Sequence, residues 1–278
     1  MTSNLDLGVI GNGSFGALID PRARIVWSCM PAFDGDPVFC SLLEPRDHDG
    51  GDFSIELEDF ERSEQAYVTN TAILRTVLYD SRGGAVEVID FAPRWRWHDR
   101  FYRPVTIARR VTPLAGHPRI RVRLRPLTHW GAHRAETTWG SNHVRYLLPD
   151  YTLRLTTDVP VRFIRDELPF VLTRPTHLLL GPDETVTRSL PGFMHEALER
   201  TTDYWREWVR YLSVPLEWQD AVIRSAITLK LCQYEDSGAI IAAMTTSIPE
   251  APHTPRNWDY RYCWLRDAAF VVRALNRL

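Results

Sequence analysis

Hydrophobic and polar residues alternate in short runs over the first two thirds of the chain. Residues 86–89, 121–125 and 152–156 each have a period of two, which is typical of strands that bury one face. Sequences rich in proline, glycine and aspartate separate such runs and favour tight turns. These turn sequences are residues 20–22, 80–84, 148–150 and 181–183. The pattern predicts a mainly β fold, an antiparallel β-sandwich over residues 1–190.

The hydrophobic period lengthens to three or four residues after Pro191, which predicts helices. The first helix is expected to end before Pro215. Its predicted inner face consists of Phe193, Ala197, Thr201, Tyr204, Trp205, Trp208 and Leu212. A second helix is predicted over residues 217–234. Its predicted inner face consists of Trp218, Val222, Ser225, Leu229 and Cys232. Residues 239–244 indicate a short strand or a buried connector.

A third helix is predicted to begin near Tyr262 and to continue to the last residue. Its apolar face consists of Leu265, Ala268, Ala269, Val272 and Leu275. Two amphipathic helices and the start of a third are too few to bury their apolar faces on one another. We therefore expect a sandwich at 1–190, a helical linker at 191–214 and, at 215–278, the start of a larger helical domain that is cut off at Leu278.

Charge and composition exclude several classes of partner. The 278 residues include 33 basic and 35 acidic ones in mixed order, for a net charge of −2. The chain thus lacks the basic surface that nucleic-acid binding requires. It shows neither a signal-peptide pattern nor an apolar run of eighteen residues, so we expect a cytoplasmic protein without a membrane partner. The oligomeric state is not predicted.

Neither cysteines nor histidines predict a metal site, and no cofactor is expected. The four cysteines are Cys29, Cys40, Cys232 and Cys263. They are too scattered for a zinc site or a disulfide framework, so buried thiols are expected. His129 and His133 have the spacing of ligands on a helix, but Trp130 and Gly131 between them favour a loop.

A glycine-rich segment near the N-terminus offers a dinucleotide-binding alternative. Residues 11–16 fit the pattern G-x-G-x-x-G, and Asp34 follows at a distance suited to a ribose contact. The fingerprint requires a helix directly after the glycines. Residues 17–27 instead predict strand, turn and strand, with Pro21 where the helix interior would be.

The densest group of chemically useful side chains lies at residues 257–267. Tyr260 and Trp264 can stack on the C–H faces of a sugar ring. Arg266 offers a rigid fork of donors, and Asp267 offers two acceptors for neighbouring hydroxyls. The ten tryptophans of the chain agree with a sugar site. Similar clusters also form structural plugs between domains, so these residues alone leave both interpretations open.

Three segments carry a resemblance to a known family. Residues 256–267 resemble the first active-site motif of glycoside hydrolase family 15, the glucoamylases and related trehalases. Residues 7–43 resemble the start of the trehalase-like N-terminal sandwich of bacterial members, and residues 221–250 resemble the beginning of their catalytic domain. The resemblance implies that an (α/α)6 barrel follows the sandwich and that the substrate is an α-glucoside.

The same resemblance implies roles for individual residues. The positions that match Tyr260, Trp264, Arg266 and Asp267 hold the non-reducing-end glucose, and Trp258 and Asp259 are further candidates. The family hydrolyses by inversion, with one carboxyl group as general acid and another as general base. Both are expected beyond Leu278, so the chain alone is expected to be inactive. Neither Glu235 nor Asp259 is assigned a catalytic role.

Other functions stay open at the level of the sequence. The chain alone could be a non-catalytic interaction module or glucan-binding module, and segment 11–16 leaves a dehydrogenase as a third alternative. Trehalose is not distinguished from maltooligosaccharides or other glucans. The loop at 27–37 could reach the rim of a sugar pocket, but burial of Trp27 and Phe33 in the sandwich core is the stronger expectation.

Overall fold

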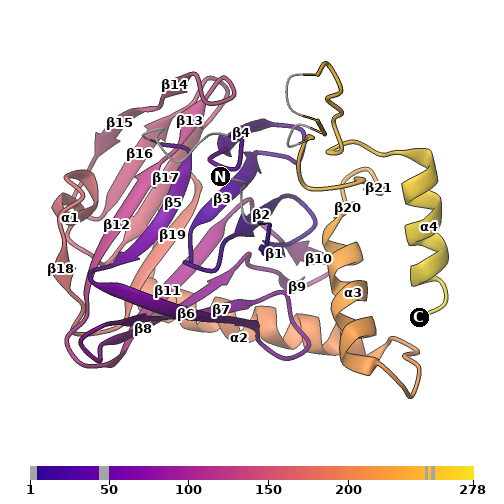
Figure 1. Cartoon of the computed structure of the whole chain (residues 1–278), viewed down its shortest axis with the longest axis horizontal. Helices are drawn as coiled ribbons and strands as arrows, with labels where there is room; N and C mark the ends of the chain where they lie inside the picture. Colours follow the sequence, from indigo (N-terminus) through magenta and orange to yellow (C-terminus); the bar gives the residue numbers. More distant parts are fainter. Residues whose placement is uncertain (1–4, 44–49, 248–249, 252–253) are drawn as a thin grey trace.

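Two antiparallel sheets form the body of the molecule (Figure 1). The computed structural model describes residues 5–43, 50–247, 250–251 and 254–278. Within them, the first sheet has seven strands in the order β1-β2-β3-β5-β12-β18, with β4 paired to β3. Its strands are β1 (Gly8–Gly11), β2 (Gly16–Ile19), β3 (Ile25–Met30), β4 (Asp36–Phe39), β5 (Asp52–Leu57), β12 (Arg119–Arg125) and β18 (Phe170–Val171).

The second sheet has eight strands in the order β15-β16-β17-β19-β11-β8-β7-β6. They are β6 (Phe60–Tyr67), β7 (Leu74–Asp80), β8 (Ala85–Phe91), β11 (Ile107–Ala115), β15 (Glu136–Trp139), β16 (His143–Leu147), β17 (Thr152–Thr157) and β19 (Thr176–Pro182). Three short hairpins complete the β structure: β9 (Trp95–Trp97) with β10 (Arg100–Tyr102), β13 (Leu127–Thr128) with β14 (His133–Arg134), and β20 (Gln233–Tyr234) with β21 (Ala239–Ile240).

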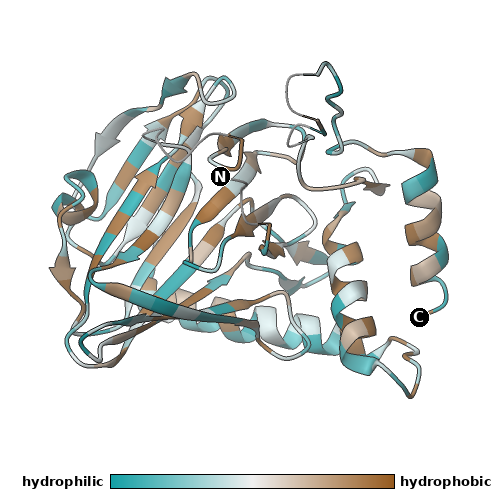
Figure 2. Cartoon of the chain, in the orientation of Figure 1, coloured by the Kyte–Doolittle hydropathy of each residue, from teal (hydrophilic) through white to brown (hydrophobic). Residues whose placement is uncertain are grey.

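The predicted mainly β architecture is confirmed. Hydrophobic and hydrophilic residues alternate along the long strands (Figure 2), and the inward residues of both sheets form one continuous core. Three predicted turns join consecutive strands: residues 20–22, 80–84 and 148–150. The fourth turn prediction was wrong, because Gly181 and Pro182 are still paired within β19. Gly181 packs so closely on Thr106 that a Cβ atom would lie 2.3 Å from its hydroxyl oxygen.

The glycine-rich segment at 11–16 is a hairpin. β1 ends at Gly11, β2 begins at Gly16, and β3 follows after a turn. Without a helix after the glycines, no helix N-terminus is present there to bind a pyrophosphate. The expected strand, turn and strand are therefore confirmed, and the geometry opposes the dehydrogenase alternative.

Four helices accompany the sheets in the described part of the chain: α1 (Val161–Arg165), α2 (Leu190–Arg210), α3 (Gln219–Leu231) and α4 (Leu265–Leu275). In Figure 1, α2 runs along one edge of the sandwich, and α3 stands between the sandwich and α4. Ser189 caps α2, since its Oγ accepts a hydrogen bond from the Gly192 N–H at 3.5 Å. No helix in these described ranges is long and apolar enough to cross a membrane.

The predicted inner face of α2 is partly confirmed. Ala197, Thr201 and Trp205 are buried as expected. Leu190, Met194 and Val209 are the other buried residues of this helix. The predicted members Phe193, Tyr204, Trp208 and Leu212 are only partly buried at the margins of this contact.

The predicted inner face of α3 was wrong. Its buried residues are Ile223, Ala226, Ile227 and Leu231, and Trp218 is 80% exposed. The helix is turned so that its branched aliphatic residues pack on Val9 of β1 and Trp205 of α2. The sequence offered two competing apolar stripes, and the contact with the sandwich selected the aliphatic one.

A buried ion pair links the two sheets. Arg109 in β11 and Asp90 in β8 are directly opposite each other in the second sheet, and both side chains are fully buried. Arg109 Nε donates to Asp90 Oδ1 at 2.7 Å. Its Nη1 donates to the Phe53 carbonyl of β5 at 2.7 Å, and its Nη2 donates to the Ala23 carbonyl before β3. One guanidinium therefore satisfies acceptors from both sheets.

We expect Arg109→Met to lower the free energy of unfolding by about 3–5 kcal/mol, because it leaves a charged carboxylate buried without its partner. Urea unfolding followed by tryptophan fluorescence measures the loss. Arg119→Met is the matched control, since Arg119 and Glu58 form an exposed pair worth less than about 1 kcal/mol. Asp90→Leu added to Arg109→Met should recover part of the loss. Equal effects of Arg109→Met and Arg119→Met would contradict this role.

Candidate functional site

The candidate sugar-binding segment is held by irregular backbone pairing with a neighbouring segment, outside the two sheets. Residues 257–264 run antiparallel to residues 241–247, with isolated bridges at Ile241–Cys263 and Thr246–Asp259. The Ala243 N–H donates to the Tyr260 carbonyl at 2.8 Å, and the Ser247 N–H donates to the Trp258 carbonyl at 2.7 Å. Ile248 and Pro249, which belong to the segment that resembles the family, lie outside the described residues.

The aromatic candidates form one cluster. The rings of Tyr260 and Trp264 lie 5.4 Å apart at an angle of 36°, and Trp258 meets Trp264 edge to face at 6.4 Å. Trp264 Nε1 donates to the Asp259 carbonyl at 3.0 Å, which fixes the plane of its indole. Trp258 Nε1 donates to Glu250 at 2.9 Å. The cluster presents partly exposed aromatic surface of the kind that stacks on sugar C–H faces.

Arg266 and Asp267 lie in the first turn of α4, as expected. They form an ion pair with each other, with 3.2 Å between Arg266 Nη2 and Asp267 Oδ2. The Arg266 side chain is 73% exposed, so its donors are accessible to a ligand. Among the described residues, no hydrogen bond or ring contact joins this pair to Tyr260 or Trp264. The structure therefore places the four candidates on one short segment as two separate pairs.

Arg261 joins this segment to the sandwich. The residue is only 4% exposed, and its Nη1 donates to the Gly35 carbonyl in the β3–β4 loop at 2.7 Å. Its Nη2 lies 2.8 Å from Asp259 Oδ2, and its guanidinium lies 4.6 Å from the ring centre of Trp130. A buried arginine with contacts to three separate segments is typical of a structural clamp.

The electrostatics of this clamp favour the charged pair. Partial burial works to raise the pKa of Asp259, but the hydrogen bonds from Arg261 outweigh it and lower the pKa. For Arg261, burial lowers the pKa and the bonds to Asp259 raise it, with a net rise. Burial raises the pKa of the neighbouring Cys29 to about 11, so Cys29 meets Arg261 as a neutral thiol. Asp259 therefore remains ionised and bound to Arg261.

Residues 27–37 were expected to form a loop, but only 31–35 do so, because 27–30 belong to β3 and 36–37 to β4. Gly35 in this loop contacts the candidate segment through Arg261. Trp27 is 1% exposed and Phe33 is 5% exposed, which agrees with their expected burial. Trp27 Nε1 donates to the Met244 carbonyl at 2.6 Å, and Phe33 meets Tyr234 edge to face at 6.0 Å. Both aromatic residues are therefore buried against the neighbouring stretches that carry Met244 and Tyr234, and they do not form a wall of an open pocket.

Glu235 is also held in ion pairs. Its Oε1 lies 2.6 Å from Arg94 Nη2 and 2.8 Å from Lys230 Nζ. Burial raises the pKa of Glu235, but the two cations lower it further than burial raises it. A general acid of a glycosidase needs a raised pKa, so this environment opposes such a role.

Histidines and cysteines show no cluster in the described part of the chain that could hold a metal ion. The rings of His129 and His133 meet edge to face at 5.4 Å near the β13–β14 turn. Cys29 and Cys40 are buried as expected. The expectation was wrong for Cys263, which is exposed, and Cys232 is only partly buried.

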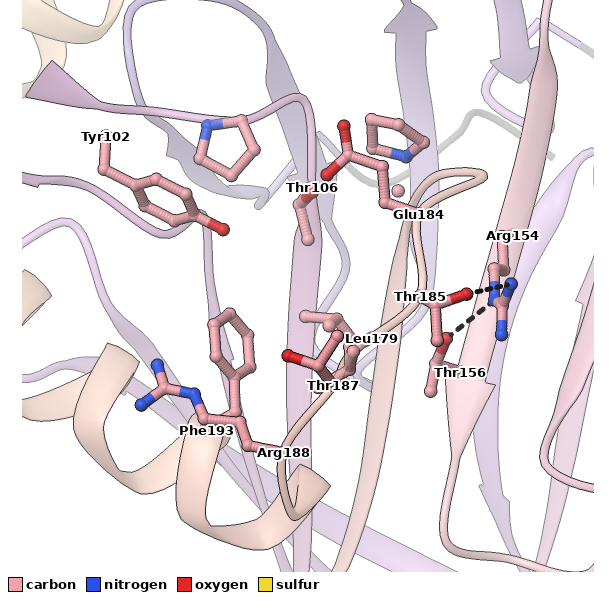
Figure 3. A pocket seen from close by; sticks show the side chains of 14 residues that line it. Tyr102, Thr106, Arg154, Thr156, Leu179, Glu184, Thr185, Thr187, Arg188 and Phe193 are labelled. Atoms are coloured by element: carbon pink, nitrogen blue, oxygen red, sulfur yellow. Dashed lines mark hydrogen bonds between the residues drawn. The ribbon is translucent and has the colours of Figure 1, made fainter.

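A separate cavity of about 200 Å³ lies between the end of β19 and the start of α2 (Figure 3). Tyr102, Glu184 and Phe193 are among its lining residues. Arg154 forms part of its wall and donates to Thr156 at 3.2 Å. The candidates at 258–267 do not line it, so the cavity and the sugar candidates are distinct features.

Arg261 and the 27–37 loop were not predicted as partners. The sequence indicated that residues 257–267 could fill a domain interface, but it did not indicate which arginine would be buried against the sandwich. The signal available was the spacing Asp259-x-Arg261, which suits a local ion pair. The contact with Gly35 spans 226 positions and leaves no local pattern in the sequence.

Comparisons with known proteins agree with this arrangement. The sequence profile described as trehalase-like, N-terminal, matches residues 5–151, and the profile of glycosyl hydrolases family 15 matches residues 218–278. The first match alone covers just over half of the chain. The chain therefore belongs to the family that carries the trehalase-like N-terminal domain, and its residues 218–278 are similar to glycosyl hydrolases family 15.

Three curated relatives are trehalases. The trehalase of Thermoplasma volcanium is 28% identical and is matched over 98% of this chain and 44% of its own length. Trehalase 1 of Sulfolobus acidocaldarius is 31% identical, over 97% of this chain and 45% of the relative. The trehalase of Mycobacterium tuberculosis is 29% identical, over 98% and 44%. The chain thus spans about half the length of the curated relatives it matches.

Among solved structures, an active YidC insertase with its first transmembrane domain resolved matches 82% of this chain and 50% of its own, at 12% identity and a TM-score of 0.40. A likeness at this level supports no inference about function.

We expect Arg261→Met to loosen residues 256–264, because it removes the bonds to Gly35 and Asp259 together. Each lost bond to a charged group costs about 1.5–3 kcal/mol. Amide hydrogen exchange in this segment should accelerate at least tenfold. Arg256→Met is the control, since Arg256 and Glu250 form an exposed pair. Unchanged exchange in Arg261→Met would refute the role of Arg261 as a clamp.

Proposed function

We propose that residues 1–278 are part of an exo-acting, inverting α-glucoside hydrolase that releases glucose, and that trehalose is its substrate. The similarity to trehalases along nearly the whole chain carries this proposal. The division into a sandwich at 1–190, a helical linker at 191–214 and the start of a barrel at 215–278 belongs to the same proposal.

The proposed glucose site consists of Tyr260, Trp264, Arg266 and Asp267. The tilted aromatic pair offers a face for the pyranose ring. The exposed guanidinium and the carboxylate supply donors and acceptors for adjacent hydroxyls. Asp259 orders the segment through its pair with Arg261, and Trp258 extends the aromatic surface.

The reaction requires two carboxyl groups about 6.5–9.5 Å apart. The general acid gives its proton to the glycosidic oxygen as the bond to the anomeric carbon breaks, and the general base takes a proton from the attacking water. The ion pairs around Asp259 and Glu235 oppose either role for these residues. We propose that both groups come from sequence outside the 278 residues, so that this chain alone is inactive.

Hydrolysis of trehalose by the full-length protein encoded at this locus should yield β-glucose and α-glucose in equal amounts at early times. Water attacks one anomeric carbon with inversion, and the leaving glucose keeps its α configuration. Proton NMR of a fresh digest measures both anomers. In H₂¹⁸O the label should enter the β-anomer only. Initial formation of α-glucose alone would refute inversion, and digestion of maltotriose but not trehalose would refute the substrate.

Asp267→Asn in the full-length enzyme should weaken transition-state binding by about 2–3 kcal/mol, because a charged contact to a substrate hydroxyl is lost. This corresponds to a fall in kcat/KM of roughly 30- to 150-fold. Steady-state assays of glucose release measure the change. Asp166→Asn, at an exposed ion pair on α1, is the control and should leave kcat/KM unaltered. An unchanged value for Asp267→Asn would remove Asp267 from the glucose site.

A second candidate is a non-catalytic interaction or glucan-binding module formed by this chain alone. The observation that favours it is that the sandwich has its own continuous core. In that case the 278 residues should bind maltooligosaccharides or trehalose without releasing glucose.

A further inference from the structure

A cleft rich in aromatic residues is lined in part by the Arg94–Glu235 ion pair. It has a volume of about 570 Å³ and lies between the β9–β10 hairpin, α2 and the end of α3; Figure 1 shows these elements close together. We call it the hairpin–α2 cleft. Its lining residues are Arg94, Trp95, Arg96, Phe101, Arg200, Asp203, Tyr204, Glu207, Trp208, Tyr211, Lys230 and Glu235.

One stripe of α2 supplies half of this lining. Its six members are Arg200, Asp203, Tyr204, Glu207, Trp208 and Tyr211. They recur every three or four residues and so share one helical face, beside the face that packs on the sandwich. Three aromatic rings and two carboxylates thus alternate along one wall of the cleft. Tyr204 and Trp208 also pack against the margin of the sandwich contact, whereas Asp203, Glu207 and Tyr211 are exposed.

The floor of the cleft is rigid and its charges are paired. The Arg94 guanidinium lies 4.5 Å from the ring centre of Tyr204 and 4.9 Å from that of Phe101. Phe101 and Tyr204 meet edge to face at 5.8 Å. Arg94 and Lys230 both bind Glu235. The rings of Phe101 and Tyr204 are therefore held in place before any ligand arrives, which reduces the entropy lost on binding.

The rim of the cleft keeps unused hydrogen-bonding groups of both kinds. Asp203 and Glu207 are exposed, and among the described residues neither has an ion pair or a side-chain hydrogen bond. Arg96, on the hairpin, is likewise exposed. The two carboxylates disfavour an anionic ligand, while Arg96 disfavours a cationic one; Arg200 is paired with Glu196. A neutral ligand with many hydroxyl groups can use both, because each hydroxyl donates and accepts.

We propose that the hairpin–α2 cleft binds a neutral oligosaccharide, with sugar rings on Trp208 and Tyr211 and hydroxyls on Asp203 and Glu207. The volume is within the range of small-molecule sites. The cleft contains none of Tyr260, Trp264, Arg266 or Asp267. It is therefore a binding site separate from the proposed glucose site and does not depend on it.

Titration calorimetry of the 278-residue protein with maltotriose and with trehalose tests this proposal. Tyr211→Ser and Glu207→Gln should each weaken binding of at least one sugar tenfold or more. Tyr211 is 79% exposed, so its replacement should not unfold the protein. Trp218→Ala and Trp139→Ala are matched controls, because these tryptophans are 80% and 54% exposed and lie outside the cleft.

Trp264→Ala separates the two sites, and it should leave the binding assigned to the cleft unchanged. Absence of binding by the unmodified protein would overturn the proposal. So would binding that survives both Tyr211→Ser and Glu207→Gln, or binding that Trp264→Ala abolishes. Glucose release by the full-length enzyme tests the proposed catalytic function independently, since no residue of the cleft takes part in that assignment.

Discussion

The guanidinium of Arg109 is a fully buried charge that binds acceptors of both sheets of the sandwich. It lies in β11 and is fully buried with Asp90 of β8, and it also binds carbonyls that belong to the opposite sheet and its preceding turn. Apolar packing alone is tolerant of small shifts between stacked sheets. A buried charge with fixed acceptors is not tolerant, because each unsatisfied bond in the interior is costly. The pair therefore restricts how the sheets can be placed.

The placement of the sheets also determines where the candidate site is held. With the sheets fixed, Trp27 of β3 meets the segment at 241–247 through its indole, and Gly35 of the β3–β4 loop meets the segment at 257–264 through its carbonyl. Arg261 then closes the contact with its own ion pair to Asp259. The sandwich contributes no side chain to the proposed sugar contacts. Its contribution is to hold one side of the segment that carries Tyr260 and Trp264.

The sequence predicted most of the architecture because that part depends on local patterns. Period-two runs and turns depend on residues that are close together in the sequence. In the turn at 80–84, for example, Asp80 accepts hydrogen bonds from the Arg82 and Gly84 N–H groups. Gly181 was wrongly predicted to form a turn. A glycine is required there because the backbone packs closely on Thr106, which is distant in the sequence. The face of α3 was misassigned because two apolar stripes compete in its sequence, and only packing on β1 and α2 distinguishes them.

The candidate site shows the same limit more sharply. Its residues could be selected from their chemistry and from the family resemblance, and their position at the start of α4 followed from helix periodicity. The inward turn of Arg261 could not be predicted, because its acceptor is 226 positions away. An arginine, an aspartate and several aromatics next to one another fit a clamp and a sugar site equally well. The structure assigns Arg261 to the clamp and leaves Arg266 on the accessible side.

The two halves of the candidate site also differ in how firmly they are held. Tyr260 and Trp264 belong to a segment with backbone pairing, an indole hydrogen bond and the Arg261 clamp. Arg266 and Asp267 lie on α4, which buries none of its residues and leaves Leu265 87% and Phe270 62% exposed. A helix with few buried contacts opens at low free-energy cost. The aromatic platform is therefore the preorganised half of the site, and the polar pair depends on what covers the apolar face of α4.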